Sequence, residues 1–202
     1  TALQQQARLP VRSEVPLVGM VSRLDEVKGM DLMEPVLTWL LGERDAQFVL
    51  LGTGDPRYHR MFEEVQRRYP DRMRAFLKFD AVLARRIYAS ADMFLMPSYV
   101  EPCGLGQMIA MRYGSVPVVR ETGGLADTVI DHARERGHGT GFVFPEKTPE
   151  ACKDALQGAL EVYQDREIWR ALQMRGMASD FSWEASAEEY VDLYHKAIAV
   201  HE

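Results

Sequence analysis

Short apolar runs alternate along the chain with longer segments of helical periodicity. The runs that predict buried strands are 16–21, 48–51, 74–79, 93–96, 116–119 and 141–144. Helical patterns separate several of them, at 30–41, 82–91, 107–111 and 125–130. Where helices alternate with strands in this way, each helix carries the chain back across the sheet and the strands run parallel. The pattern therefore predicts an α/β fold, a parallel sheet flanked by helices on both faces.

Two helix starts carry strong local signals. Asp55 is followed by Pro56, and Thr148 by Pro149. A short polar side chain caps free N–H groups, and proline suits the first helical position. Further helical patterns cover 151–163, 167–178 and 183–202. We expect a polar lead at 1–13, a ligand-binding domain at 14–180 and a C-terminal helix at 181–202.

Composition narrows the class of protein. The chain has 202 residues, is 47% hydrophobic and carries a formal net charge of −6. A general nucleic-acid surface or anionic-membrane surface is therefore not expected, and any anionic ligand needs a local cluster of cations. The two cysteines and five histidines show no disulfide or metal-ligand spacing. With no signal peptide or apolar run of membrane length, we expect a cytoplasmic protein. The chain starts at Thr1 in a glutamine-rich lead, which suggests a cut inside a longer protein.

Residues 101–127 hold two glycine-bearing turns, and each lies between an apolar run and a helical pattern. A strand that ends in such a turn directs free backbone N–H groups and the positive end of a helix dipole toward one point. Other polar or glycine residues also follow predicted strands: Ser22-Arg23, Gly52-Thr53-Gly54 and Phe79-Asp80. Ligands of open parallel sheets bind beyond the carboxyl ends of the strands. The sequence thus predicts a site for a phosphorylated ligand at that edge.

The ordered set of motifs resembles the C-terminal half of bacterial glycogen/starch synthases, which are retaining glucosyltransferases of the GT-B fold. The resemblance covers nearly everything from residue 16 onward. The motifs are Ser22-Arg23-Leu24-x-x-x-Lys28-Gly29-x-Asp31, Gly52-Thr53-Gly54, 91–98, Glu101-Pro102-Cys103-Gly104-Leu105, 112–117, Thr122-Gly123-Gly124-Leu125-Ala126-Asp127, 139–144 and Asp180-Phe181-Ser182-Trp183.

The resemblance implies a Rossmann-like, nucleotide-sugar-binding C-terminal domain of a GT-B enzyme. It implies transfer of glucose from ADP-glucose, or another nucleotide glucose, to the non-reducing end of an α-1,4-glucan, with retained configuration. It also implies that no metal or other cofactor is needed. The acceptor glucan would bind with the help of a missing N-terminal domain, toward which the last helix would return. We therefore expect this chain alone to bind nucleotide but to have little transferase activity.

Arg23 and Lys28 are the first candidate catalytic residues. The resemblance implies that the pair grips the diphosphate of the donor. Cations held at the leaving group stabilise its charge more strongly as the sugar–phosphate bond breaks, and so raise the rate. The intervening Asp25 and Glu26 are more acidic than is usual there, and we expect both to point away from the phosphates. The simpler alternative is two surface cations beside a loop.

Glu101 is the third candidate catalytic residue. By resemblance it hydrogen-bonds a hydroxyl of the donor sugar, and the Cys103 and Gly104 amides lie along that sugar. The alternative is a carboxylate that only caps a helix. Gly106 stands where threonine is usual, and Ile109 where many relatives of the wider fold have a second glutamate, which glycogen-type synthases commonly lack.

The remaining candidates are substrate-binding residues. Thr122, Gly123 and Gly124 are expected as a backbone cradle for phosphate and sugar, since glycine permits close approach; the alternative is an ordinary turn. Phe79 is expected against the nucleobase, with a core role as the alternative. Cys103 is expected to line the site rather than act as a nucleophile. The full substrate-binding set is Ser22, Gly54, Phe79, Cys103, Gly104, Leu105, Gly106, Thr122, Gly123 and Gly124.

Three other functions stay open from the sequence. The first is a different retaining GT-B glycosyltransferase, against which the Glu-Pro-Cys-Gly-Leu run and Ile109 argue. The second is a nucleotide-sugar epimerase of similar architecture. The third is a non-catalytic module that senses nucleotide sugars.

Overall fold

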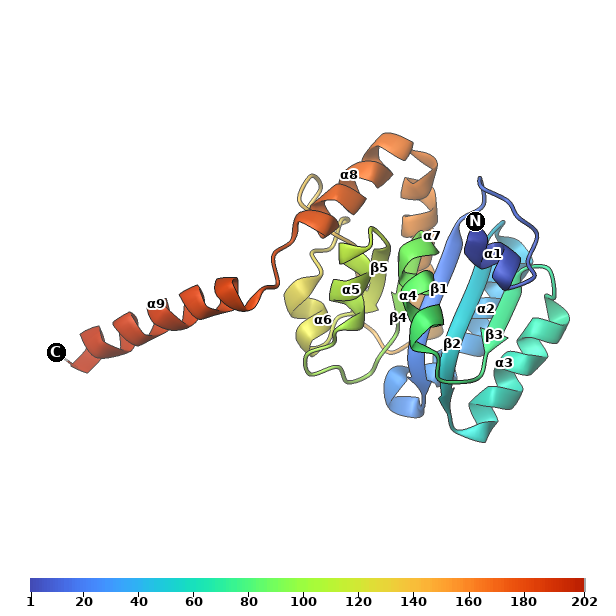
Figure 1. Cartoon of the computed structure of the whole chain (residues 1–202), viewed down its shortest axis with the longest axis horizontal. Helices are drawn as coiled ribbons and strands as arrows, with labels where there is room; N and C mark the ends of the chain where they lie inside the picture. The colour runs from blue at the N-terminus through green and yellow to red at the C-terminus, as the bar shows by residue number, and fades with distance from the viewer. Residues whose placement is uncertain (202) are drawn as a thin grey trace.

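A six-stranded parallel sheet forms the centre of the protein, whose computed structural model describes residues 1–201 (Figure 1). The strands are β1 (Leu17–Leu24), β2 (Gln47–Gly54), β3 (Met73–Phe76), β4 (Met93–Met96), β5 (Val116–Arg120) and β6 (Phe142–Phe144). Their order across the sheet is β3-β2-β1-β4-β5-β6. The expected α/β fold with a parallel sheet is confirmed.

Helices cover both faces of the sheet. The helices of the sheet domain are α1 (Ala2–Gln6), α2 (Met33–Glu43), α3 (Pro56–Arg68), α4 (Ala81–Ser90), α5 (Gly106–Arg112), α6 (Gly123–Thr128), α7 (Pro149–Gln164) and α8 (Arg166–Ala178). The last helix, α9 (Trp183–His201), follows them. Two 3-10 turns, η1 (Glu26–Lys28) and η2 (Met30–Leu32), precede α2. The helix starts at Asp55 and Thr148 are confirmed, because these side chains accept hydrogen bonds from Arg57 N and Ala151 N.

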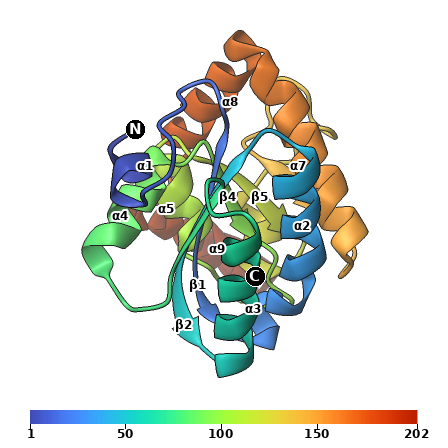
Figure 2. The same ribbon diagram turned by 90° about the vertical axis from the view of Figure 1, so that its right-hand side faces the viewer.

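Alternation along the strands divides the core into two layers. Successive strand side chains point to opposite faces, so Val18 and Met20 of β1 pack in a cluster with α2, α3 and α7. Leu17 of β1 and Val49 of β2 pack on the other face, with α1 and α4. Figure 2 shows the strands between these two groups of helices. Both faces are buried, which is why the strands read as apolar runs rather than as alternating patterns.

The first thirteen residues differ from the polar lead that the sequence suggests. Leu3, Ala7 and Leu9 are buried and belong to the same cluster as α4. Gln4 is also buried, and its Nε2 donates to Gln47 Oε1 over 2.8 Å. Apolar residues four apart on one face of α1, with a satisfied glutamine beside them, anchor this segment to the domain.

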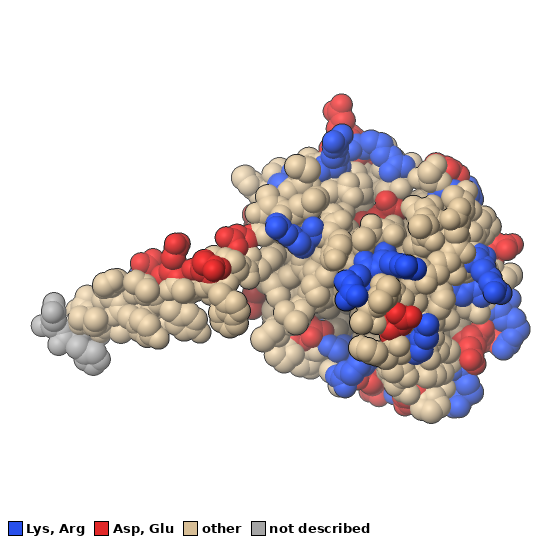
Figure 3. Space-filling model, viewed as in Figure 1, with Lys and Arg blue, Asp and Glu red and all other residues tan. Residues whose placement is uncertain are grey.

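Helix α9 extends away from the domain (Figure 1). Ser182 caps it, since Ser182 Oγ accepts a hydrogen bond from Ala185 N. Trp183 and Tyr194 remain 86% and 62% exposed. Figure 3 shows acidic side chains along one edge of this helix. No helix in the described part of the chain is both long and apolar enough to cross a membrane.

Removing residues 183–202 tests whether the sheet domain is self-contained. We expect the free energy of unfolding in urea to change by less than about 0.5 kcal/mol, as for other changes at exposed positions. A longer deletion, of residues 166–202, also removes the buried Trp169 and Leu172 of α8 and should cost more than about 3 kcal/mol. A large loss in the shorter deletion would show that α9 stabilises the domain.

Candidate functional site

Strands β1 and β4 separate at their carboxyl ends. β1 pairs with β2 along its whole length, but with β4 only at Val18–Met93 and Gly19–Phe94. The chain turns in opposite directions from these two central strands, and this is where ligands bind in such sheets. A cavity of about 200 Å³ lies there, and its lining includes Ser22 and Arg23 of β1 and Ser98 after β4.

Lys28 reaches this cavity because the turn that carries it packs closely against Pro97, which directly follows β4. Asp25 caps η1, with Lys28 N donating to Asp25 Oδ1 over 3.0 Å. Gly29 then adopts φ +70°, and a Cβ there would lie 2.1 Å from the Pro97 carbonyl oxygen. Only glycine combines this backbone conformation with this approach.

A partly buried ion pair joins the two sides of the cavity. Lys28 Nζ lies 2.5 Å from Glu101 Oε2, and the two side chains are 18% and 11% exposed. Ser98 Oγ donates to the same oxygen over 3.0 Å. Among the described residues, Glu101 Oε1 accepts no hydrogen bond, which leaves it able to receive a hydroxyl from a ligand. Glu101 is therefore a positioned acceptor rather than a helix cap.

Arg23 lies beside the pair and is more exposed. Its side chain is 73% exposed, and Nη1 is 3.2 Å from Asp25 Oδ2. Asp25, which the sequence suggests should point away from the phosphates, lies against the guanidinium that is expected to bind them, because it caps η1 at this place. Glu26 does point elsewhere, and pairs with Arg57 over 3.1 Å. An exposed pair such as Arg23–Asp25 is worth about 0.2–1 kcal/mol, so Arg23 can exchange its partner at low cost.

A second cavity, of about 370 Å³, adjoins the first and shares Ser22 and Arg23 with it. The end of β2, the loop after β3 and the first turn of α4 complete it, and Phe79 lies in that loop. Phe79 is 87% exposed, which excludes a core role for this ring. An exposed aromatic face in a cavity that also contains Arg23 suits a flat ring system attached to an anion.

The second glycine turn packs against the loop that carries Glu101. Gly124 N donates to the carbonyl oxygens of Glu101 and Pro102, over 3.0 and 3.1 Å. A Cβ at Gly124 would lie 1.7 Å from the Cys103 carbonyl oxygen, and Gly123 has φ +42°. In this conformation the turn supports the Glu101 loop, and the Gly124 N–H is directed at protein carbonyls.

The two cavities bring together seven of the predicted residues: Ser22, Arg23, Lys28, Phe79, Glu101, Leu105 and Gly106. The others line neither cavity: Gly54, Cys103, Gly104, Thr122, Gly123 and Gly124. Gly54 ends β2, where a Cβ would lie 2.4 Å from the Leu24 carbonyl oxygen. Thr122 is the N-cap residue of α6, at the base of the Glu101 loop.

Sequence reasoning missed buried polar residues that hold the loops. Gln107 is fully buried, and its Nε2 donates to the carbonyl oxygens of Cys103 and Gly104 over 3.1 and 3.0 Å. Arg120, at the end of β5, is 93% buried. In the sequence, each of these polar residues interrupts or ends an apolar run. That placement was the one signal from which their burial could have been predicted.

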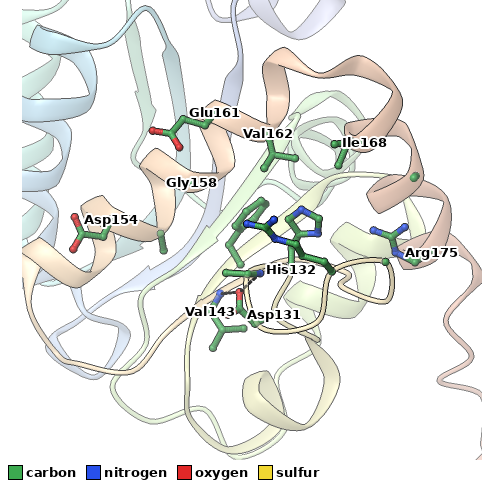
Figure 4. A pocket seen from close by; sticks show the side chains of 15 residues that line it. Asp131, His132, Val143, Asp154, Gly158, Glu161, Val162, Ile168 and Arg175 are labelled. Atoms are coloured by element: carbon green, nitrogen blue, oxygen red, sulfur yellow. Dashed lines mark hydrogen bonds between the residues drawn. The ribbon is translucent and has the colours of Figure 1, made fainter.

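A larger cavity, of about 670 Å³, lies elsewhere, between the 131–137 loop, β6, α7 and α8 (Figure 4). Asp154 and Glu161 of α7 are among its lining residues, and Arg175 of α8 donates to the Gly139 carbonyl oxygen over 2.7 Å. Burial and the nearby arginines lower the pKa of His132. This cavity contains none of the predicted site residues.

Comparison with known proteins identifies the family to which the chain belongs. A profile of the family described as "Glycosyl transferases group 1" matches residues 3–171. The chain belongs to this family. It is 55% identical over 193 residues to a glycogen synthase of Anaeromyxobacter sp. strain K, and 48% identical over 197 residues to one of Thermosipho africanus. These alignments cover 96% and 97% of this chain but 40% of each relative.

Solved structures of glycosyl-transferring synthases share the fold of this chain. The chain superposes with TM-score 0.86 and 40% identity on the catalytic domain of starch synthase IV from Arabidopsis thaliana, solved with ADP and acarbose. The match covers 98% of this chain and 42% of that one. Sucrose-phosphate synthase from Thermosynechococcus elongatus gives TM-score 0.68 at 28% identity. The expected fold, that of the C-terminal domain of a GT-B glycosyltransferase, is confirmed.

Gly29→Ala tests the close approach that places Lys28. Alanine at a positive φ costs about 1–2 kcal/mol in any setting. Gly137→Ala is the matched control, because Gly137 has φ +94° and a Cβ there meets no atom within 4 Å. We expect Gly29→Ala to cost at least about 1 kcal/mol more than the control in urea unfolding, since Pro97 must move. Equal losses would mean that this contact is easily relieved.

Proposed function

We propose that this chain is the donor-binding domain of an α-1,4-glucan synthase. The full enzyme transfers glucose from ADP-glucose to the non-reducing end of glycogen or starch, with retained configuration. The observation that carries the proposal is the Lys28–Glu101 pair between β1 and β4. A cation for phosphate and a carboxylate for a sugar hydroxyl stand side by side at the place where this fold binds ligands.

The relatives support this choice of substrate. The curated relatives cited above are glycogen synthases, and the starch synthase IV domain was solved with ADP and acarbose. These relatives are longer than this chain, which supports a second, N-terminal domain facing the same edge of the sheet. That domain supplies the acceptor-glucan site and further catalytic groups, and α9 returns toward it. Alone, this chain binds nucleotide and has little transferase activity.

Arg23 and Lys28 stabilise the leaving group. An ammonium group has three N–H donors, so Lys28 keeps its contact with Glu101 while it donates to a phosphate oxygen. Arg23 exchanges Asp25 for the diphosphate and binds it through two parallel hydrogen bonds. Charge builds up on the diphosphate as the bond to glucose breaks, and fixed cations act most strongly at that stage. We propose that these two side chains do this without a metal ion.

Glu101 orients the glucose ring. Its Oε2 is held by Lys28 and Ser98, so Oε1 accepts a ring hydroxyl in a fixed direction. The Cys103 and Gly104 amides lie along the sugar, and the 122–124 turn supports this loop and contributes to phosphate binding. Phe79 lies against the adenine in the adjoining cavity, and Ser22 and Arg23 lie where base and diphosphate meet.

Arg23→Ala and Lys28→Ala test the diphosphate assignment. Each removes charged hydrogen bonds worth about 1.5–3 kcal/mol, so calorimetry should show Kd for ADP rising about 10- to 100-fold. Arg67→Ala is the matched control, because Arg67 is 70% exposed and pairs with Glu64 on the same helix, α3, away from both cavities. Wild-type protein that does not bind ADP, or variants that bind it like the control, would contradict the proposal.

Phe79→Ala tests the nucleobase assignment separately. Loss of one stacked ring should raise Kd for ADP about five- to tenfold, while Phe79→Tyr keeps the affinity. Binding of inorganic pyrophosphate, which has no base, should be unchanged in both variants. A parallel loss of pyrophosphate affinity would indicate that Phe79 acts by supporting the loop instead.

A further inference from the structure

Arg120 is a buried cation directly behind the candidate site. It ends β5 and is 7% exposed. Burial lowers the pKa of its guanidinium, which nevertheless stays charged near neutral pH. Among the described residues no carboxylate pairs with it. A buried charge without a counter-ion is unfavourable unless hydrogen bonds compensate it.

Main-chain carbonyl groups satisfy the guanidinium. Nε donates to Ser98 O over 2.8 Å, and Nη2 donates to Tyr99 O over 2.6 Å. Nη1 donates to Pro145 O over 3.3 Å. Arg120 therefore fixes the direction of two successive peptide groups in the loop between β4 and Glu101. A lysine cannot reproduce this planar set of donors.

The segment Ser98-Tyr99 is also held from its other side, by the residues that flank Lys28. Tyr99 N donates to Val27 O over 2.7 Å, and Tyr99 Oη donates to Asp31 Oδ2 over 2.5 Å. Ser98 Oγ in turn donates to Glu101. The segment 98–99 is thus clamped between Arg120 and the residues flanking Lys28, and it contacts the carboxylate directly.

We propose that Arg120 is a positioning residue that aligns Glu101 with Lys28 for recognition of the hexose of a nucleotide sugar. The inference deepens the proposed function and rests on it. Arg120 touches neither cavity, and acts through the Ser98 and Tyr99 carbonyls. Its removal therefore weakens recognition of the sugar more than recognition of the diphosphate, which Arg23 and Lys28 bind.

The ratio of two dissociation constants tests this role. Kd for ADP and for ADP-glucose is measured by calorimetry in wild type and Arg120→Met. We expect the ratio to shift against ADP-glucose by about fivefold or more, the effect of one misplaced hydrogen bond. Arg72→Met is the matched control, because Arg72 donates to the Leu41 and Arg44 carbonyl oxygens at a distant place. That variant should lose stability without changing the ratio.

A double-mutant cycle of Arg120→Met with Glu101→Gln distinguishes an effect of Arg120 that passes through Glu101 from a general loss of structure at the site. If Arg120 acts through Glu101, the shift in the double variant is smaller than the product of the single shifts. An unchanged ratio in Arg120→Met, or independent effects in the cycle, would overturn the inference alone. Wild type that binds neither nucleotide would overturn the proposed function as well. Should Arg120→Met not fold, Arg120→Lys keeps the charge, loses the planar contacts and must show the same shift.

Discussion

The separation of β1 from β4 beyond Gly19–Phe94 is the constraint on which the candidate site depends. Beyond this point β1 remains hydrogen-bonded to β2 on one side of the opening, and β4 remains hydrogen-bonded to β5 on the other. The space between the two central strands receives side chains from both halves of the sheet. The Lys28 turn lies on one side of this opening and the Glu101 loop on the other, and these two segments are the rims of the site. The sheet holds the two rims at a fixed distance from each other.

Close backbone contacts keep the rims together. Gly29 brings the Lys28 turn against Pro97, and Gly124 brings α6 against the loop of Glu101. Tyr99 and Arg120 then lock the segment between these two contacts. A ligand that is recognised by a few directed hydrogen bonds needs such rigidity, because small displacements of the acceptor weaken each bond. Arg23 is the exposed cation in this arrangement, and its pair with Asp25 can be exchanged at low cost.

Much of the fold follows from the sequence because both faces of the sheet are buried. Apolar runs then mark strands directly, and the caps at Asp55 and Thr148 mark helix starts. The boundaries differ where tertiary contacts extend a strand: β2 runs on through Gly52-Thr53-Gly54 because β1 continues beside it. Residues 1–13 differ because a few buried residues in a polar segment are enough to anchor α1 once a neighbouring surface exists.

The sequence alone determined the parallel α/β fold, the family resemblance and the residue types at the strand ends, since these depend on local pattern and order. The tertiary structure decided which of those residues meet. It joined Lys28 to Glu101, placed Asp25 against Arg23, exposed Phe79 and turned the Gly124 N–H toward protein carbonyls. It also revealed Arg120, whose three carbonyl partners come from two distant loops. Such contacts depend on distances across the sheet, which no local pattern encodes.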